Sequence, residues 1–190
     1  MIAVGVLVIA VLVPVLRQRG DSSQVLSGPA PTPSATPSAT PTVSPVAPPP
    51  AGYRLYRDPA GWSIAVPTAW PATRRGAAVS FRGGDRVLSV TERANPPVDP
   101  YAARLAQEKS RGATIPGYDF MRVGRVPYRS WPTADWEYRA GTQPVMHTIV
   151  RTTIPAPDRA YEIAWTTEDR RWTADHSVLD AAIRTFDPGD

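Results

Sequence analysis

The chain changes its hydrophobic pattern several times, and each change predicts a different kind of structure. Residues 2–16 are uninterrupted apolar residues, whereas the Pro-rich stretch that follows has no hydrophobic face to bury. From Tyr53 onward, apolar side chains recur at every second position over short runs, which is typical of strands with one buried face. Helical spacing appears over residues 100–111 and again over residues 172–184.

The first strands are expected to form hairpins. In the stretch YRDPAGWSIAVPTAW, residues 56–70, the large apolar residues Trp62, Ile64 and Val66 alternate with small residues after a turn at 58–61. A Trp inside a strand is a large core side chain, and Pro67 ends the strand because it lacks an N–H. We therefore interpret this stretch as a fold marker and not as the edge of an active site. A second hairpin is expected over 77–93, with Gly83-Gly84-Asp85 at the bend.

Four further strands and two helices complete the prediction. The strands are expected at 118–126, 133–140, 145–154 and 159–166. Asp99 is expected to cap the first helix, with Pro100 at its first position and Gly112 at its C-terminal end. The apolar stripe of this helix is Tyr101, Ala102, Leu105 and Ala106, and that of the second is Val178, Leu179, Ala182, Ile183 and Phe186. This order has no βαβ alternation, so it predicts an α+β domain with a mostly antiparallel sheet and packed helices.

We divide the chain into a membrane anchor or signal-like helix (1–17), a disordered Pro/Ser/Thr/Ala-rich linker (18–52) and a globular α+β domain (53–188). As a helix, residues 2–16 span about 22 Å, less than the roughly 30 Å of a bilayer core. No positive residue precedes them, so we expect the natural chain to begin upstream of Met1. Arg17 and Arg19 favour a cytoplasmic linker, whereas Ser/Thr/Pro tracts are typical of extracellular stalks. We favour a single-pass membrane protein with an extracytoplasmic C-terminal domain, and a secreted protein as the alternative.

Composition narrows the possible functions. The chain has no cysteine, which excludes disulfides, thiolate metal sites and a cysteine nucleophile. The formal net charge is +4, and the basic residues are scattered, so the sequence lacks the basic stripe of a nucleic-acid-binding protein. With only two histidines and no cysteine, we expect no metal and no cofactor.

Several residues resemble those of a known set of domains. The positions Asp58, Gly61-Trp62 and Val66-Pro67, the motif YEIAW (161–165) and the terminal IRTFDP (183–188) resemble actinobacterial membrane-tethered extracytoplasmic domains. Some of those domains lie at the outer end of serine/threonine protein kinases. The resemblance implies a PsbP/Mog1-like α/β/α sandwich over about residues 53–188, with no catalytic motif to transfer. The glycine-rich loop, H-R-D and D-F-G motifs of a kinase catalytic domain do not occur in the chain.

Few residues suggest chemistry. A Ser-His-Asp set from Ser130 or Ser177 with His147 and Asp135 lacks a G-x-S-x-G motif to present the serine. Asp135 and Glu137 share one face of a strand, which we interpret as its charged solvent face. His147 is interpreted as a strand-face histidine and His176 as an exposed helix histidine. As a possible ligand-binding surface we name Trp70, Trp131, Trp136, Tyr138, Arg170 and Arg171, the last two for an anion at a helix N-terminus.

These observations favour a non-catalytic, membrane-tethered extracytoplasmic binding or sensor module. Its partner is expected to be a cell-envelope ligand or a membrane protein, with the membrane itself contacted through residues 2–16. Two alternatives stay open: a secreted hydrolase-type enzyme, and an assembly or stability factor for a membrane complex.

Overall fold

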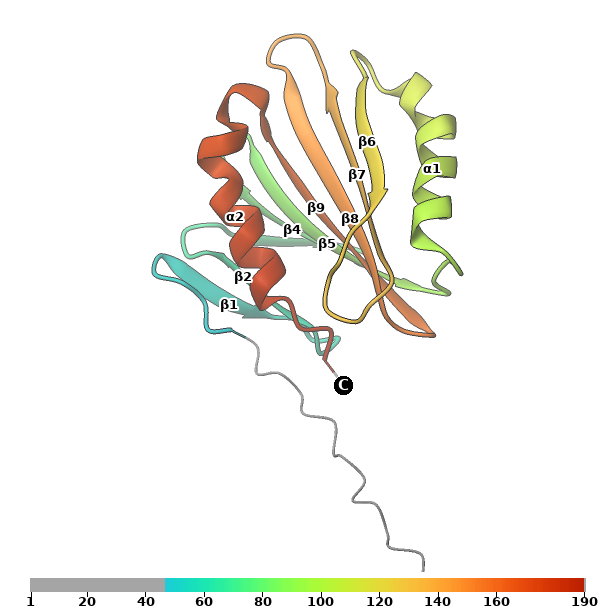
Figure 1. Cartoon of the computed structure of the whole chain (residues 1–190). Helices are drawn as coiled ribbons and strands as arrows, with labels where there is room; N and C mark the ends of the chain where they lie inside the picture. The colour runs from blue at the N-terminus through green and yellow to red at the C-terminus, as the bar shows by residue number, and fades with distance from the viewer. Residues whose placement is uncertain (1–46, 190) are drawn as a thin grey trace, which may run out of the picture. The chain divides into compact units, whose positions relative to one another are not determined.

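The computed structural model of the chain describes residues 47–189 (Figure 1). The expected apolar helix and most of the expected linker lie outside the described residues. Neither helix in the described part of the chain is both long and apolar enough to cross a membrane.

Within residues 47–189, five strands precede the first helix and four lie between the two helices. The strands are β1 (Tyr53–Arg57), β2 (Ser63–Pro67), β3 (Ala72–Arg75), β4 (Ala78–Gly83), β5 (Arg86–Ala94), β6 (Asp119–Arg125), β7 (Thr133–Ala140), β8 (Met146–Ala156) and β9 (Arg159–Glu168). The helices are α1 (Pro100–Arg111) and α2 (Trp172–Thr185), each with an adjoining 3-10 turn, η1 (Gly112–Thr114) and η2 (Asp169–Arg171). The sequence did not predict β3, because all four of its residues are exposed and carry no apolar alternation.

The strands form two antiparallel sheets. β1 and β2 make a hairpin, and the other strands make a seven-stranded sheet in the order β3-β4-β5-β9-β8-β7-β6. Every neighbouring pair in both sheets is antiparallel. The predicted α+β class with a mostly antiparallel sheet is therefore confirmed.

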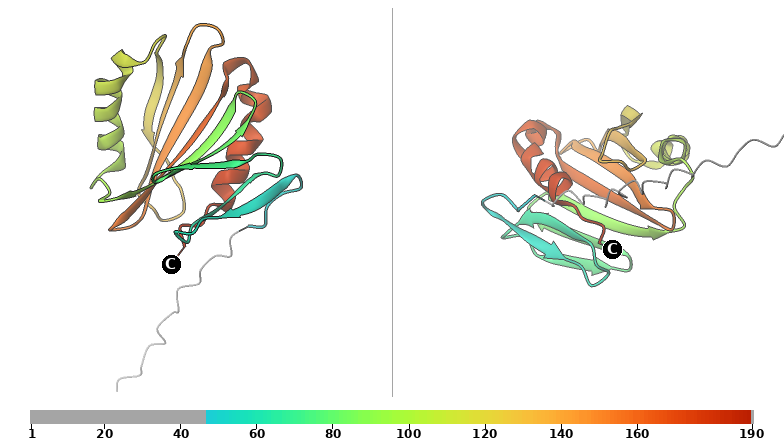
Figure 2. Two further views of the ribbon diagram at one scale, coloured as in Figure 1. Left: turned by 180° about the vertical axis from the view of Figure 1, so that it is seen from behind. Right: turned by 60° about the horizontal axis from the view of Figure 1, so that its bottom comes forward.

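The two helices cover opposite faces of the large sheet. Arg104 of α1 donates a hydrogen bond to Thr152 of β8, whereas Trp172 of α2 stacks on His147 of the same strand. Side chains at odd and even positions of a strand point to opposite faces, so α1 and α2 lie on different sides. Figures 1 and 2 show the sheet between α1 and α2, with the β1–β2 hairpin beside α2.

The main core lies on the α2 side, where the β1–β2 hairpin and α2 together cover the sheet. Its buried side chains include Trp62, Ile64 and Val66 from the opening hairpin, packed with Phe81, Leu88, Val90, Tyr161, Ile163, Trp165, Leu179 and Phe186. Ile64 and Val66 are fully buried, and each contributes about 1.5–3 kcal/mol by leaving water. The opening stretch is thus part of the core, as predicted.

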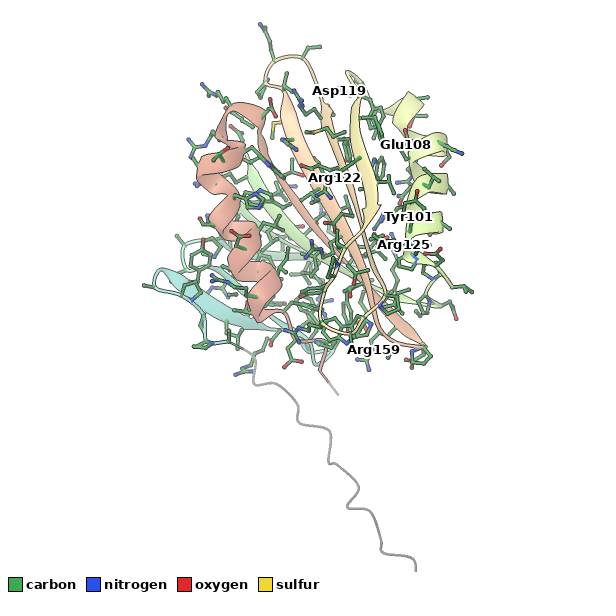
Figure 3. The ribbon with its side chains drawn as sticks, viewed as in Figure 1. Tyr101, Glu108, Asp119, Arg122, Arg125 and Arg159 are labelled. Atoms are coloured by element: carbon green, nitrogen blue, oxygen red, sulfur yellow. The ribbon has the colours of Figure 1, made fainter. Side chains whose placement is uncertain are left out.

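Polar contacts help to attach helix α1 to the sheet. Its cap Asp99 accepts a hydrogen bond from the Tyr101 N–H and two 2.7 Å bonds from Arg125 of β6, whose guanidinium also lies over the Tyr101 ring (Figure 3). Ala102 and Ala106 are exposed, and the buried residue at the centre of the helix is Arg104. The predicted apolar stripe was therefore wrong for Ala102 and Ala106, whereas Tyr101 and Leu105 are half-buried.

Gly112 also differs from its predicted role. It has a right-handed helical φ of −51° and continues into η1, so it is not a left-handed C-terminal cap. A Cβ at this position would lie 2.7 Å from the Tyr118 ring, so the close approach of that ring explains the glycine.

Candidate functional site

A groove of about 390 Å³ lies between α2 and strands β6, β7 and β8. It forms because α2 packs on β2 and β9, while β7 and β6 extend the sheet beyond the helix. Arg122 lines the groove from β6, and Asp135, Ile149 and Arg151 line it from β7 and β8. The α2 side is made by His176, Ser177, Leu179, Asp180, Ile183 and Arg184.

A buried ion pair makes the floor of the groove. The Arg151 guanidinium donates two hydrogen bonds of 2.8 Å to the two carboxylate oxygens of Asp135, which is only 1% exposed. Burial is the largest single effect and lowers the pKa of Arg151, but the hydrogen bonds to Asp135 and the negative charge of Asp135 together raise this pKa above its ordinary value. This paired geometry satisfies the buried carboxylate, which would otherwise be costly to bury.

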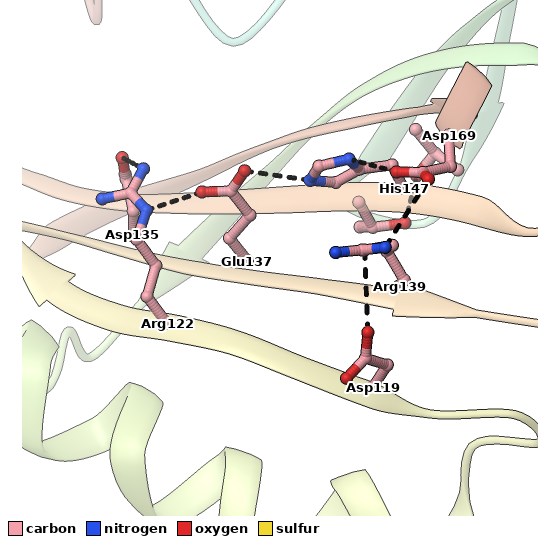
Figure 4. A network of polar contacts seen from close by, with 9 residues as sticks. Asp119, Arg122, Asp135, Glu137, Arg139, His147 and Asp169 are labelled. Atoms are coloured by element: carbon pink, nitrogen blue, oxygen red, sulfur yellow. Dashed lines mark hydrogen bonds and ion pairs between the residues drawn. The ribbon is translucent and has the colours of Figure 1, made fainter. Parts of the chain in front are cut away.

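A chain of alternating charges runs from the groove along the same face of the sheet (Figure 4). The Nε of Arg122 donates to Glu137 at 2.6 Å, and the other Glu137 oxygen lies 2.9 Å from His147 Nε2. His147 Nδ1 lies 3.0 Å from Asp169, whose second oxygen lies 3.7 Å from Arg139. Arg139 in turn lies 3.6 Å from Asp119 at the start of β6.

His147 is enclosed within this chain of alternating charges. It is 3% exposed, and its ring stacks on Trp172 at the start of α2. Each of its ring nitrogens has a carboxylate oxygen within hydrogen-bond distance, Glu137 at Nε2 and Asp169 at Nδ1. His147 does not line the groove. Its position joins β7 and β8 to the start of α2.

The sequence interpretation of Asp135 and Glu137 as a charged solvent face was wrong. Both are buried, Glu137 at 8% exposure, because arginines and His147 from neighbouring strands cover them. The opposite face of β7 is covered too: Trp136 is 3% exposed, and its indole N–H donates to the Tyr118 hydroxyl.

The C-terminal end of α2 is fixed by the connection between β6 and β7. The Tyr128 hydroxyl donates a 2.7 Å hydrogen bond to the Ile183 carbonyl, and the Arg129 guanidinium donates to the Phe186 carbonyl at 2.6 Å. Burial raises the pKa of Tyr128 to about 12, so its hydroxyl keeps its proton. The helical wall of the groove is therefore held at both ends, by Trp172 and by Tyr128.

None of the six residues named from sequence as a ligand-binding surface lines the groove. Trp70 is 6% exposed and stacks on Trp165, and Trp136 is buried with Tyr138 beside Tyr118. Trp131 is half-buried against Tyr128.

The two arginines of that set are at η2 and each already has a carboxylate partner. Arg170 pairs with Glu168, and Arg171 donates to Asp175. The Arg171 hydrogen bond, which outweighs burial, lowers the pKa of Asp175.

Sequence reasoning missed Arg122, Arg151 and Arg184, which line the groove. The available signal was the acidic pair at 135 and 137, because a buried acidic pair requires basic partners on adjacent strands.

The formal catalytic set is not assembled. His147 contacts Glu137 and Asp169 in place of Asp135, and Ser130 is exposed on the loop after β6. Ser177 lines the groove, where the neighbouring His176 lies 3.6 Å from Asp180. Within residues 47–189, no group of three or more His, Asp or Glu side chains is arranged to hold a metal ion.

Comparison with solved structures defines the fold class. Cyanobacterial PsbP (CyanoP) from Synechocystis superposes with a TM-score of 0.57 at 17% identity, over 79% of this chain and 97% of that one. A Pseudomonas aeruginosa protein of unknown function described as a putative regulator, PA94, superposes with a TM-score of 0.50 at 14% identity, over 73% and 98%. The chain therefore has a PsbP-like fold, as its resemblance implied. No curated protein sequence matches the chain.

The sequence also defines a family. Residues 54–188 match the family described as the serine/threonine kinase C-terminal domain, and the chain belongs to that family. The match covers the sheet and both helices, so the groove and the charged chain lie within the family domain. The family description names the C-terminal domain of serine/threonine kinases.

Proposed function

We propose that the chain is an extracytoplasmic, membrane-tethered binding or sensor module, and that its ligand occupies the groove between α2 and strands β6–β8. The observation that carries the proposal is the groove itself. It brings guanidinium groups from β6, β8 and α2 next to apolar side chains of α2 and β8. One wall is the sheet and the other is α2, which is held at both of its ends. Pockets of a few hundred Å³ with an apolar lining and a few placed polar groups are typical ligand sites.

Family membership supports an accessory role. A domain outside the catalytic part of a kinase has no residues of its own for phosphoryl transfer. Such a domain therefore serves the kinase by binding a ligand or a partner. His147, the buried histidine, is held by two carboxylates and a Trp, which favours a structural role for it over catalysis.

The location is part of the proposal. The apolar run 2–16 is the membrane anchor, and the Pro-rich residues 18–52 are the spacer. An extended Pro-rich chain advances about 3.1 Å per residue, so such a spacer holds the domain several tens of Å from the bilayer. The test is protease treatment of intact cells: loss of the domain is expected, and protection of the domain contradicts the proposed location.

The binding role is tested by capture. The 190-residue chain, immobilised through its C-terminus, is incubated with cell-wall fragments and membrane extracts of its own cells. Ser177→Trp places a large side chain in the groove, and Ser110→Trp adds the same side chain to an exposed position on α1. We expect the unchanged chain and Ser110→Trp to enrich the same component, and Ser177→Trp to lose it. If nothing is enriched, the binding role is wrong; if Ser177→Trp captures equally well, the groove is not the site.

A further inference from the structure

We propose that the groove between α2 and strands β6–β8 selects an organic anion: a small molecule with one carboxylate or phosphate group on an apolar body. This inference rests on the proposed binding function and adds the chemical class of the ligand.

The anion would meet arginines that are not saturated by protein carboxylates. Arg184 donates one 3.3 Å hydrogen bond to the Asp180 carbonyl and makes no ion pair with any carboxylate of residues 47–189. Arg122 uses its Nε for Glu137 and has a second, longer contact of 3.9 Å with Asp135, but its side chain is 50% exposed at the opposite wall. A planar guanidinium points two parallel N–H donors at the two oxygens of a carboxylate or phosphate. These two arginines are therefore suited to hold one oxyanion between them.

The carboxylates in the groove do not cancel this charge. Arg122 pairs with Glu137 and Arg151 pairs with Asp135, whereas Arg184 has no carboxylate partner among residues 47–189. Asp135 is already held by both bonds from Arg151, and Asp180 is 59% exposed on the helix. A ligand with a single negative charge would give Arg184 the ionic partner that the described residues do not supply.

The rest of the lining favours an apolar body. Ile149, Leu179 and Ile183 lie beside the charged groups and present side chains that cannot hydrogen-bond. A volume of about 390 Å³ admits a molecule the size of a substituted ring or a short branched acid. An inorganic ion would leave this part of the groove unused.

A second arginine-lined hollow, beside η2, is a weaker anion site, and its Arg86 lies 3.5 Å from Asp175. It contains Arg170 and Arg171, but Glu168 and Asp175 already pair with them. An anion there would have to displace a carboxylate, whereas at Arg184 it displaces only water.

Benzoate, phenyl phosphate and benzamide are suitable probes, because they share one ring and differ in the charged group. Each is titrated into the isotope-labelled 190-residue chain in detergent micelles, and binding is followed by NMR at physiological salt. We expect benzoate, phenyl phosphate or both to shift the side-chain signals of Arg184, Arg122 and Ile149. The stronger of the two identifies the oxyanion. Neutral benzamide, which also controls for partition into the micelle, is expected to leave these signals unchanged; equal shifts with benzamide would overturn the proposal.

Arg184→Gln and Arg170→Gln form a matched pair of exposed arginine substitutions. Loss of one charged contact is expected to weaken binding of the anionic probe roughly ten-fold in Arg184→Gln, with an unchanged melting temperature. Arg170→Gln is expected to bind as the unchanged chain does, and the reverse result would assign the anion to η2. If the captured envelope component binds in the groove but no anionic probe does, the ligand class is wrong and the binding function stands.

Discussion

The imidazole of His147 and the indole of Trp172 lie face to face, with ring centroids 3.6 Å apart and ring planes 7° from parallel. The two residues join β8 to the first turn of α2, and α2 forms one wall of the groove. Glu137 and Asp169 hold the imidazole in the plane that the stack requires. The charged chain on the sheet therefore positions the helix.

Removing the two His147 hydrogen bonds is expected to destabilise the domain. His147→Phe keeps a ring against Trp172 but removes one partner from Glu137, which is buried, and one from Asp169. We expect a loss of about 2–4 kcal/mol in the free energy of unfolding, measured by urea denaturation. His176→Phe, at a half-exposed position on α2, is the control and should change stability by less than about 0.5 kcal/mol. Equal effects of the two substitutions would show that the charged chain contributes nothing.

Gly83 and Gly124 both lie in strands, yet they should respond differently to alanine. A Cβ at Gly83 would lie 2.0 Å from the Trp70 indole nitrogen, whereas a Cβ at Gly124 meets nothing within 4 Å. We expect Gly83→Ala to displace Trp70 from its stack on Trp165 and to cost about 1–3 kcal/mol, because overpacking strains the core. Gly124→Ala should be neutral or slightly stabilising. Thermal unfolding followed by Trp fluorescence measures both, and a tolerated Gly83→Ala would contradict the packing described for Trp70.

The pairing of Asp175 with Arg171 predicts how the stability of the domain changes at acid pH. Arg171 donates to this carboxylate at 2.9 Å, as does Thr167, and the pKa of Asp175 is lowered from 3.8 mainly by the Arg171 bond. A carboxyl whose pKa is lower in the folded state stabilises the fold above its unfolded pKa, and this contribution is lost as the pH falls through the folded pKa. We expect the unchanged chain to lose stability between about pH 5 and about pH 2 more steeply than Asp175→Asn.

Urea unfolding at a series of pH values measures this difference. Asp180→Asn, on the same helix but exposed, should keep the pH dependence of the unchanged chain. If the stability of Asp175→Asn falls with pH as steeply as that of the unchanged chain, the pairing with Arg171 does not contribute to the free energy of unfolding.

The two arginines that share Glu162 should differ in their importance for stability. Arg104 is 3% exposed and lies 2.9 Å from Glu162, and burial lowers its pKa; Arg93 contacts the same carboxylate with 52% of its side chain exposed. We expect Arg104→Met to cost about 2–4 kcal/mol of unfolding free energy, because it removes a buried partner, and Arg93→Met to cost less than about 1 kcal/mol. Similar losses in urea denaturation would contradict a polar anchor for α1.

The sequence predicted the fold well because most of its elements are set by local patterns. Alternation gave β2, β7 and β9, and Asp99 with Pro100 marked the start of α1. By contrast, alternation shows that Asp135 and Glu137 share a face, but not whether that face is exposed. Their partners, Arg151 and Arg122, are brought to them by strand register, 16 and 15 residues away along the chain.

The groove could not be predicted for a similar reason. It exists because α2 covers only part of the sheet, and the position of a helix across a wide sheet depends on packing against β2 that no local pattern encodes. Arg184 looks like an ordinary exposed residue near the end of a helix until Arg122 is placed opposite it.

The most direct test of the central claim is to observe the arginine side chains when the natural ligand binds. The envelope component captured by the 190-residue chain is added back, and the Nε–Hε NMR signals of all arginines are recorded before and after. The account predicts shifts at Arg122, Arg151 and Arg184, with Arg170 and Arg171 unchanged. Shifts confined to Arg170 and Arg171, or to arginines away from α2 and β6–β8, would contradict the groove as the binding site.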